Sequence, residues 1–273
     1  MYRPLPVQRS VRPTVTTQPP GVPGWYGKLP SLGDFASRRL APEWIETWDA
    51  WLAAGLLGWR ERDQDHWLDD YLRGPSLRFL VMPGVLPGNH CTACTAAEPG
   101  QSWVGVLMPS VDRVGRYFPL TFAQALSHLP ANANALDQLL NWLVQLDDLA
   151  VAALQDNWTP DQLEAELHAL EALPVLDAVT PSAQFAQFAT GTGTGTSTST
   201  RPHGDPTARL WALDSTPLLQ SPHGKVLWWC DGSRGQQLLR VTAGLPQAED
   251  FSALLRPPFV TTTTTEPPPP SDL

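Results

Sequence analysis

Residues 103–122 read Trp-Val-Gly-Val-Leu-Met-Pro-Ser-Val-Asp-Arg-Val-Gly-Arg-Tyr-Phe-Pro-Leu-Thr-Phe. The two apolar ends predict strands at 103–108 and 117–122, and the polar residues between them predict a turn. The first strand is apolar on both faces, which is typical of a strand that is covered on both sides. Pro119 has no backbone N–H for a sheet hydrogen bond. We therefore expect the second strand to be an edge strand, or to carry a bulge at that position.

Helices are predicted on both sides of this segment. In residues 42–60, apolar side chains recur at three- and four-residue steps, and Pro42 fits a first helical turn. A short helix is predicted at 65–72. A longer helix with a stripe of Leu and Ala is predicted at 134–155. Residues 159–162 (Thr-Pro-Asp-Gln) have the capping-box pattern, which predicts the start of a further helix.

Further strands are predicted before and after these helices. Residues 76–82 favour a strand, residues 225–230 and 236–242 favour a hairpin, and a short helix follows at 248–255. These elements belong to a block at about 207–256. A block of about 50 residues with one hairpin cannot bury a core alone, so we expect it to extend the first sheet. The order of the elements predicts an α/β/α sandwich around a mixed, largely antiparallel sheet.

Three segments are low in complexity or lack hydrophobic periodicity. Residues 1–24 are rich in Pro, Thr and Arg and are expected to form a disordered tail. A Thr/Gly/Ser insertion at 190–202 and a Pro/Thr-rich tail at 257–273 are expected to be disordered as well. The prediction is therefore a single domain at 25–256 that contains one disordered insertion.

The charge of the chain excludes one class of partner. Formal net charge is −9, and residues 131–188 contain nine acids and no Lys or Arg. A phosphate backbone is bound mainly by Lys and Arg, so nucleic acid is not an expected partner. Two interpretations of this acidic segment stay open. It is either a docking surface for a basic partner, with Asp147 and Asp148 exposed, or the solvated face of a helix.

The sequence shows no sign of a targeting segment or of bound metal. It has no apolar signal-peptide core and no run of about 18 apolar residues, so we expect a cytoplasmic protein without direct membrane insertion. Cys91, Cys94 and Cys230 are too few for a disulfide scaffold. The Cys-x-x-Cys pair has no second pair to complete a zinc site. We expect no metal and no cofactor.

Two polar segments are candidates for function. Residues 27–35 resemble a phosphate-binding loop in composition, but Lys28 precedes the loop instead of closing it. Asp34 is expected to cap the following segment or to pair with Arg38 or Arg39. In the turn at 110–116, an acid and two arginines around a glycine could bind a carboxylate or another anion. Turn chemistry alone would also explain the acid and the glycine.

No catalytic residues are predicted, because no nucleophile is accompanied by a base in a recognised spacing.

Three stretches carry a resemblance to a known family: residues 25–35 together with 48–51, residues 105–120, and residues 226–233. They resemble the signatures of the TagF (ImpM-like) family of type VI secretion system-associated proteins. The resemblance implies a cytoplasmic accessory protein that acts as a post-translational repressor of secretion-system assembly. It implies that this repressor belongs to a threonine-phosphorylation circuit with a kinase, a phosphatase and an FHA-domain scaffold.

The resemblance also implies a partner-binding role for four signature positions. These are Asp34, Ser110, Asp112 and Arg116. The implied partner is the FHA-domain scaffold, and the implied location is the cytoplasm, with recruitment to the inner-membrane secretion complex. An alternative stays open: a phosphate-ligand-binding or enzymatic protein that uses Lys28, Ser110 and Arg116.

Overall fold

The computed structural model describes residues 21–87, 101–130, 133–173, 223–231 and 237–255. The strands are β1 (Gly24–Lys28), β2 (Phe35–Arg38), β3 (Leu77–Val81), β4 (Ser102–Met108), β5 (Leu120–Leu126), β6 (Lys225–Asp231) and β7 (Gln237–Ala243). The helices are α1 (Pro42–Arg62), α2 (Trp67–Leu72), α3 (Ala133–Gln155), α4 (Pro160–Ala169) and α8 (Ala248–Leu255).

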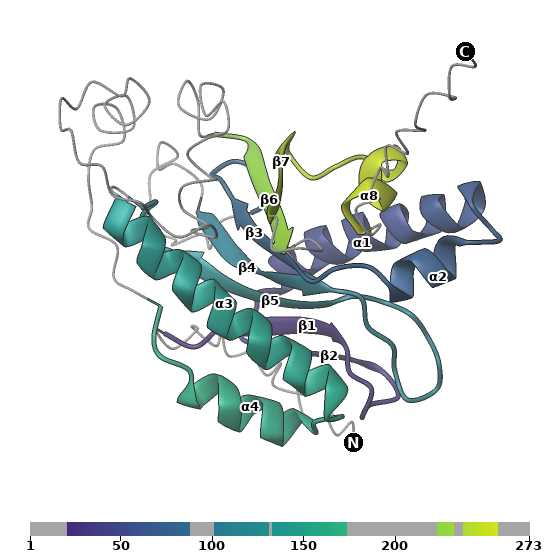
Figure 1. The fold of residues 1–273 in the computed structure, drawn as a ribbon, viewed down its shortest axis with the longest axis horizontal. Coiled ribbons are helices and arrows are strands. Elements are labelled where there is room, and N and C mark those ends of the chain that lie inside the picture. The colour runs from purple at the N-terminus through teal and green to yellow at the C-terminus, as the bar shows by residue number, and fades with distance from the viewer. Residues whose placement is uncertain (1–20, 88–100, 131–132, 174–222, 232–236, 256–273) are drawn as a thin grey trace, which may run out of the picture.

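One seven-stranded sheet forms the middle layer, in the order β2-β1-β5-β4-β3-β6-β7. Helices α3 and α4 cover one face, and α1, α2 and α8 cover the other (Figure 1). This is the predicted α/β/α sandwich. Every strand pair in the described part is antiparallel, which confirms the prediction of a largely antiparallel sheet, and no parallel pair occurs among the described strands. The late strands β6 and β7 join the same sheet through the pairing of β6 with β3.

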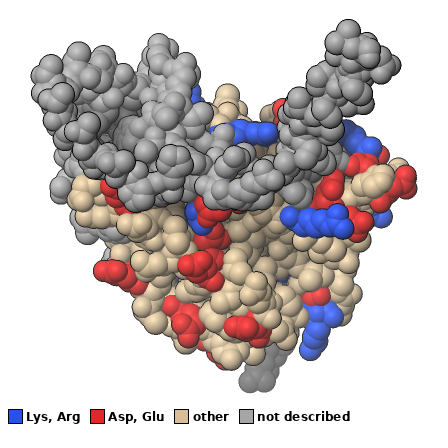
Figure 2. Space-filling view, viewed as in Figure 1, with Lys and Arg blue, Asp and Glu red and all other residues tan. Residues whose placement is uncertain are grey.

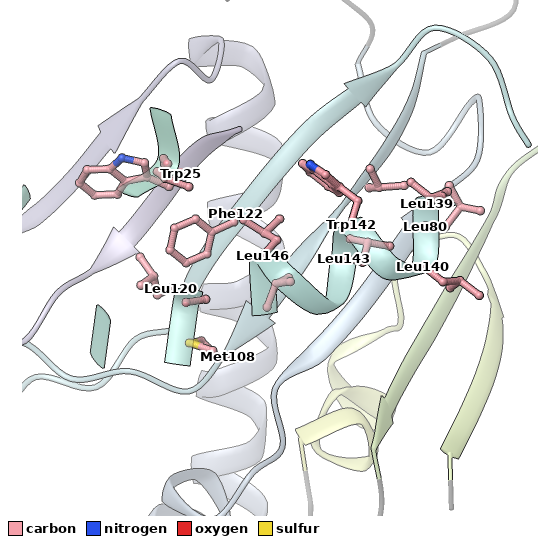
Figure 3. Packing of buried hydrophobic residues seen from close by; sticks show 14 of the residues in the cluster. Trp25, Leu80, Met108, Leu120, Phe122, Leu139, Leu140, Trp142, Leu143 and Leu146 are labelled. Atoms are coloured by element: carbon pink, nitrogen blue, oxygen red, sulfur yellow. The ribbon is translucent and has the colours of Figure 1, made fainter. Parts of the chain in front are cut away.

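The central strand β4 supplies side chains to both cores, as its apolar sequence predicts. Val104 and Val106 lie in the core under α3 and α4, whereas Trp103 and Leu107 lie in the core under α1 and α8. Figure 3 shows the first of these cores, where residues of α3 pack against residues of β3 and β5. Each large apolar side chain buried in this way contributes about 1.5–3 kcal/mol relative to an exposed one.

The second core is built around stacked aromatic rings. Trp44, Trp48 and Trp51 recur along α1 at the helical spacing and therefore share one face. Trp48 and Trp51 pack against Trp228 of β6, with ring centroids 6.3 and 5.5 Å apart, and Trp51 also contacts Phe251 of α8 at 5.3 Å. The last described elements of the chain are thus part of this core.

The strand after the polar turn differs from its prediction in start and position. β5 begins at Leu120 and pairs with both β1 and β4, so it is an interior strand and the expectation of an edge strand is wrong. Pro119 precedes the ladder, where its missing N–H breaks no sheet hydrogen bond. Tyr117 instead bridges to Val111 across the turn. Gly27 of β1 packs against this segment and leaves no room for a side chain, because a Cβ at this position would lie 2.2 Å from the Pro119 carbonyl oxygen.

The acidic residues of α3 do not all lie on one solvent-exposed face of the helix. The Asp147 carboxylate is buried, accepts a hydrogen bond from Arg78 Nε of β3 at 2.9 Å, and is also bonded by the Ser76 hydroxyl. Arg78 pairs in addition with Asp231 of β6 at 2.8 Å. The next residue, Asp148, is exposed. The interpretation that placed both acids on a docking surface is therefore wrong for Asp147.

Acidic groups are nevertheless spread over the side of the molecule that α3 and α4 cover (Figure 2). In the same view most of the visible Lys and Arg groups lie toward the right.

The start of α4 carries the predicted capping box: the Thr159 hydroxyl accepts from the Gln162 N–H at 3.3 Å, and the Gln162 side-chain oxygen accepts from the Thr159 N–H at 2.9 Å. This confirms the helix start predicted from the sequence.

Several sequence-based predictions lie outside the described residues. They concern Cys91, Cys94, the insertion at 190–202, the tail at 257–273 and all but the last residues of the tail at 1–24. Within the described ranges, no helix is long and apolar enough to cross a lipid bilayer.

Candidate partner-binding site

The turn between β4 and β5 is organised by one buried carboxylate. Asp112 Oδ2 accepts hydrogen bonds from Lys28 Nζ at 2.8 Å and from Arg116 Nε at 2.7 Å. Asp112 Oδ1 accepts from the backbone N–H groups of Val114 at 3.0 Å and Arg116 at 2.9 Å. These four donors fill the acceptor positions of the carboxylate, so the turn is fixed from within. Asp112 thereby holds the backbone and the side chain of Arg116 in place.

The same contacts keep Asp112 ionised. Burial by itself raises the pKa of this carboxyl group, but the hydrogen bonds from Lys28 and from the backbone and side chain of Arg116 outweigh it. The pKa of Asp112 is therefore held well below its ordinary value. At neutral pH the group is a permanent negative charge that balances the buried Lys28 ammonium.

Lys28 is a structural cation at the end of β1. Its residue is 3% exposed, and its Nζ lies 4.1 Å from the centroid of the Phe35 ring as well as beside Asp112. Phe35 in turn stacks on Tyr26, with centroids 5.8 Å apart, and meets Phe118 edge-on at 4.9 Å. The ammonium is thus enclosed by one carboxylate and one aromatic ring, and it is not available to a phosphate in solution.

Ser110 fastens the start of the turn to β1 and α2. Its hydroxyl donates to the Lys28 carbonyl oxygen at 2.7 Å. The Tyr71 hydroxyl of α2 accepts from the Ser110 N–H and donates to the Ser110 carbonyl, both at 2.9 Å. A carbonyl oxygen cannot remove the hydroxyl proton, so these contacts make Ser110 an anchor and not an activated nucleophile.

The outer side of the turn faces solvent. The Arg116 side chain is 53% exposed, and one of its terminal nitrogens donates to the Gly33 carbonyl oxygen. Arg113 is exposed, and its backbone N–H donates to the Leu32 carbonyl at 2.8 Å. Val114 is 63% exposed at the tip. Gly115 has φ +83°, a conformation that favours glycine, and this allows the chain to turn back.

Asp34 lies beside the turn and makes one of the two contacts that were expected for it. Its carboxylate accepts from the N–H of Phe35 at 2.8 Å, which confirms that it caps the following strand. The predicted pairing with Arg38 or Arg39 is wrong: Arg39 instead pairs with Glu164 of α4. In the described structure no ion pair involves Asp34.

The structure brings the four candidate residues together to different degrees. Asp112 and Arg116 touch, Ser110 joins them through Lys28, and Asp34 adjoins them only through its neighbour Gly33. The role of Lys28 as the buried counter-ion of Asp112 could not be predicted, because 84 positions separate the two residues in the sequence. The exposed residues Phe35 and Val114 belong to no sequence pattern that would identify them as part of the site.

The candidate site lies within a segment that matches a known family. The family model described as TagF N-terminal domain, type VI secretion system-associated, matches residues 24–170. The crystal structure of PA0076 from Pseudomonas aeruginosa PAO1 is similar in fold, with a TM-score of 0.61 and 31% sequence identity. The similarity covers 86% of this chain and 94% of that chain. A comparison with curated proteins found no match. The family match spans more than half of the chain, so this protein belongs to the TagF family of type VI secretion system-associated proteins.

Proposed function

We propose that this protein is a post-translational negative regulator of type VI secretion system assembly. It acts by binding a secretion component such as an FHA-domain scaffold, and it does so in the cytoplasm with recruitment to the inner-membrane secretion complex. Membership of the TagF family supports the link to secretion. The observation that carries the binding role is the turn at 110–116, which is locked to the sheet on one side and presents side chains to solvent on the other.

The chemistry of this site favours binding over catalysis. Lys28 is buried against Asp112 and Phe35, and the Ser110 hydroxyl is bonded to a backbone carbonyl. Neither group is placed to attack a substrate or to transfer a proton. Of the three residues in the enzymatic alternative, Arg116 alone is half-exposed, and a single guanidinium supplies charge and hydrogen bonds but no reaction.

The site is also ordered before any partner arrives. Arg116 is held at Nε by Asp112 and at a terminal nitrogen by Gly33, so its guanidinium already has a fixed direction. Immobilising a long side chain on binding typically costs about 0.5–1.5 kcal/mol. Asp112 removes most of this cost for Arg116. A pre-organised turn of this kind is suited to recognition of a protein surface.

Deletion and complementation test the proposal. We expect deletion of the gene to raise type VI secretion, and re-expression of the wild-type chain to lower it again. Val114→Asp places a charge at the exposed tip without disturbing the buried contacts, so it is expected to fold within about 0.5 kcal/mol of wild type. Val144→Asp, at a 36% exposed position of α3, is the matched control.

Each outcome bears on one part of the proposal. Affinity purification from the native cytosol should recover the FHA-domain scaffold with the wild type and with Val144→Asp, but not with Val114→Asp. Wild-type re-expression that leaves secretion high would show that the protein is not a repressor. Repression without recovery of the scaffold would keep the repressor role and exclude the FHA partner.

A further inference from the structure

Two guanidinium groups meet at Gly33. Arg116 donates a hydrogen bond to the Gly33 carbonyl oxygen, and Arg113 Nη2 lies 3.7 Å from the position that a Cβ on Gly33 would occupy. The two arginines come from one turn, and Gly33 belongs to the loop between β1 and β2. In the described structure the Arg113 side chain has no ion pair, and Arg116 shares its only carboxylate with Lys28.

The charges around Gly33 do not balance. Lys28 and Arg116 share the Asp112 carboxylate, and Arg113 and Asp34 add one charge of each sign without an ion pair in the described residues, which leaves a local excess of one positive charge. The whole chain, by contrast, has a formal net charge of −9. Basic groups concentrated at one place on an acidic protein attract a negatively charged partner to that place.

Apolar surface adjoins the two arginines. Phe35 follows Gly33 by two residues and is 44% exposed, although its ring is clamped by Tyr26, Phe118 and Lys28. Val114 lies between the two arginines in sequence and is 63% exposed. Rigid aromatic and aliphatic groups beside arginine are typical of the energetically important part of a protein interface.

We propose that the surface formed by Phe35, Arg113, Val114 and Arg116 around Gly33 binds an acidic segment of a partner protein, in which a carboxylate adjoins a large apolar side chain. The carboxylate is held by the two guanidinium groups, and the apolar side chain packs against Phe35 and Val114. This inference rests on the proposed function only in that the chain acts by binding a protein.

An acidic peptide segment fits this surface better than a free phosphate. Asp34 is exposed beside Gly33 and has no ion pair in the described residues, so its charge weakens the attraction of any anion and leaves a larger part of the affinity to the apolar contacts with Phe35 and Val114. The acidic net charge of the chain acts against nucleic acid in the same way. A peptide segment can also supply the apolar contact, which a free anion cannot.

A titration followed by NMR tests the proposal without any knowledge of the natural partner. The isotope-labelled full chain is titrated with a short synthetic peptide in which glutamates flank a phenylalanine, and with the same peptide carrying glutamines. We expect the acidic peptide to shift the amide signals of residues 33–35 and 113–116, and the amide peptide to leave them in place. Binding should weaken with added salt, because surface charges are screened beyond about 8 Å at physiological ionic strength.

Three variants complete the test. Arg113→Glu should weaken binding of the acidic peptide by about tenfold to a hundredfold, since a charge-assisted contact is lost. Arg60→Glu makes the same charge change at an exposed position of α1 and should bind like wild type. Asp34→Asn removes the repelling carboxylate and should strengthen binding. A purely structural role for these residues would not produce an increase.

The result that overturns the proposal is also specific. If the acidic peptide leaves residues 33–35 and 113–116 unshifted, this surface is not an acidic-segment site, whatever the outcome of the secretion assay. If a phosphoserine peptide binds more tightly than the glutamate peptide, the site is a phosphopeptide site instead. Wild-type re-expression that does not restore repression in the deletion strain would refute the proposed function and leave the titration result standing.

Discussion

Asp147 holds α3 against the sheet, and its replacement by alanine leaves the Arg78 guanidinium without its nearest buried partner. The side chains of this pair are 7% and 10% exposed. Burial alone lowers the pKa of Arg78, but Asp147 and Asp231 outweigh this and raise it. Asp231 is 58% exposed and cannot replace Asp147 in full. Removing one partner of a buried ion pair typically destabilises a protein by about 3–5 kcal/mol.

That free energy corresponds to a large change in melting temperature. With about 2–4 °C per kcal/mol for a domain of this size, Asp147→Ala should melt roughly 6–20 °C below wild type. Asp148→Ala, one residue later on the exposed side of α3, should stay within about 0.5 kcal/mol of wild type. Both variants are compared by thermal and urea denaturation, which report the midpoint and the free energy of unfolding.

A double variant separates charge from packing. Arg78→Met with Asp147→Leu removes both charges and keeps apolar volume, so it should recover most of the lost stability. Equal melting of Asp147→Ala and Asp148→Ala would refute the claim that this pair fastens α3. A double variant as unstable as Asp147→Ala would show that lost packing, and not an unpaired charge, causes the loss.

Three other perturbations follow from the turns and caps. Gly115→Ala should lower stability by about 1–2 kcal/mol because of its positive φ, and Gly115→Asn by less, with the melting temperature as the measure. Thr159→Ala should cost about 0.5–2 kcal/mol and speed amide hydrogen exchange in the first turn of α4; unchanged exchange would contradict the cap. Because the folded pKa of Asp112 is depressed, its contribution to stability should be complete from pH 7 to about pH 5 and decrease below about pH 4, where the unfolded chain begins to bind a proton at this carboxyl group while the folded chain does not. The free energy of unfolding measured against pH should show this decrease, and Asp112→Asn should lack it.

The helices could be predicted because their determinants are local. The tryptophans of α1 recur at three- and four-residue steps, and the capping box of α4 is formed by residues three positions apart. Strands β3, β4, β6 and β7 carry short apolar runs that end at turn residues. Such features depend on neighbouring residues alone, so no knowledge of the tertiary structure is needed.

The elements that escaped prediction depend on distant partners. All five residues of β1 are buried, so the alternation that marks a half-exposed strand is absent. Lys28 can be buried there only because Asp112 neutralises it from another part of the sequence. In the sequence Asp147 is one acid among several in an acidic segment, and nothing near it in sequence indicates that Arg78 lies opposite.

The candidate site was predicted in part for the same reason. Asp112 and Arg116 are four residues apart in one turn, and their contact could be expected from the sequence. The approach of Arg113 and Arg116 to Gly33 could not, because it depends on how the loop between β1 and β2 packs on the turn. The exposure of Phe35 likewise follows from its place on the edge strand β2.

The position of β6 has a consequence during protein synthesis. β6 at Lys225–Asp231 pairs with β3 at Leu77–Val81, so the ribosome must translate most of the chain before this strand pair can form. Until then the nascent chain exposes one backbone edge of β3 and the aromatic rings that later pack on Trp228, which favours aggregation. A chain truncated at residue 170, where the family match ends, would remain at this incomplete stage.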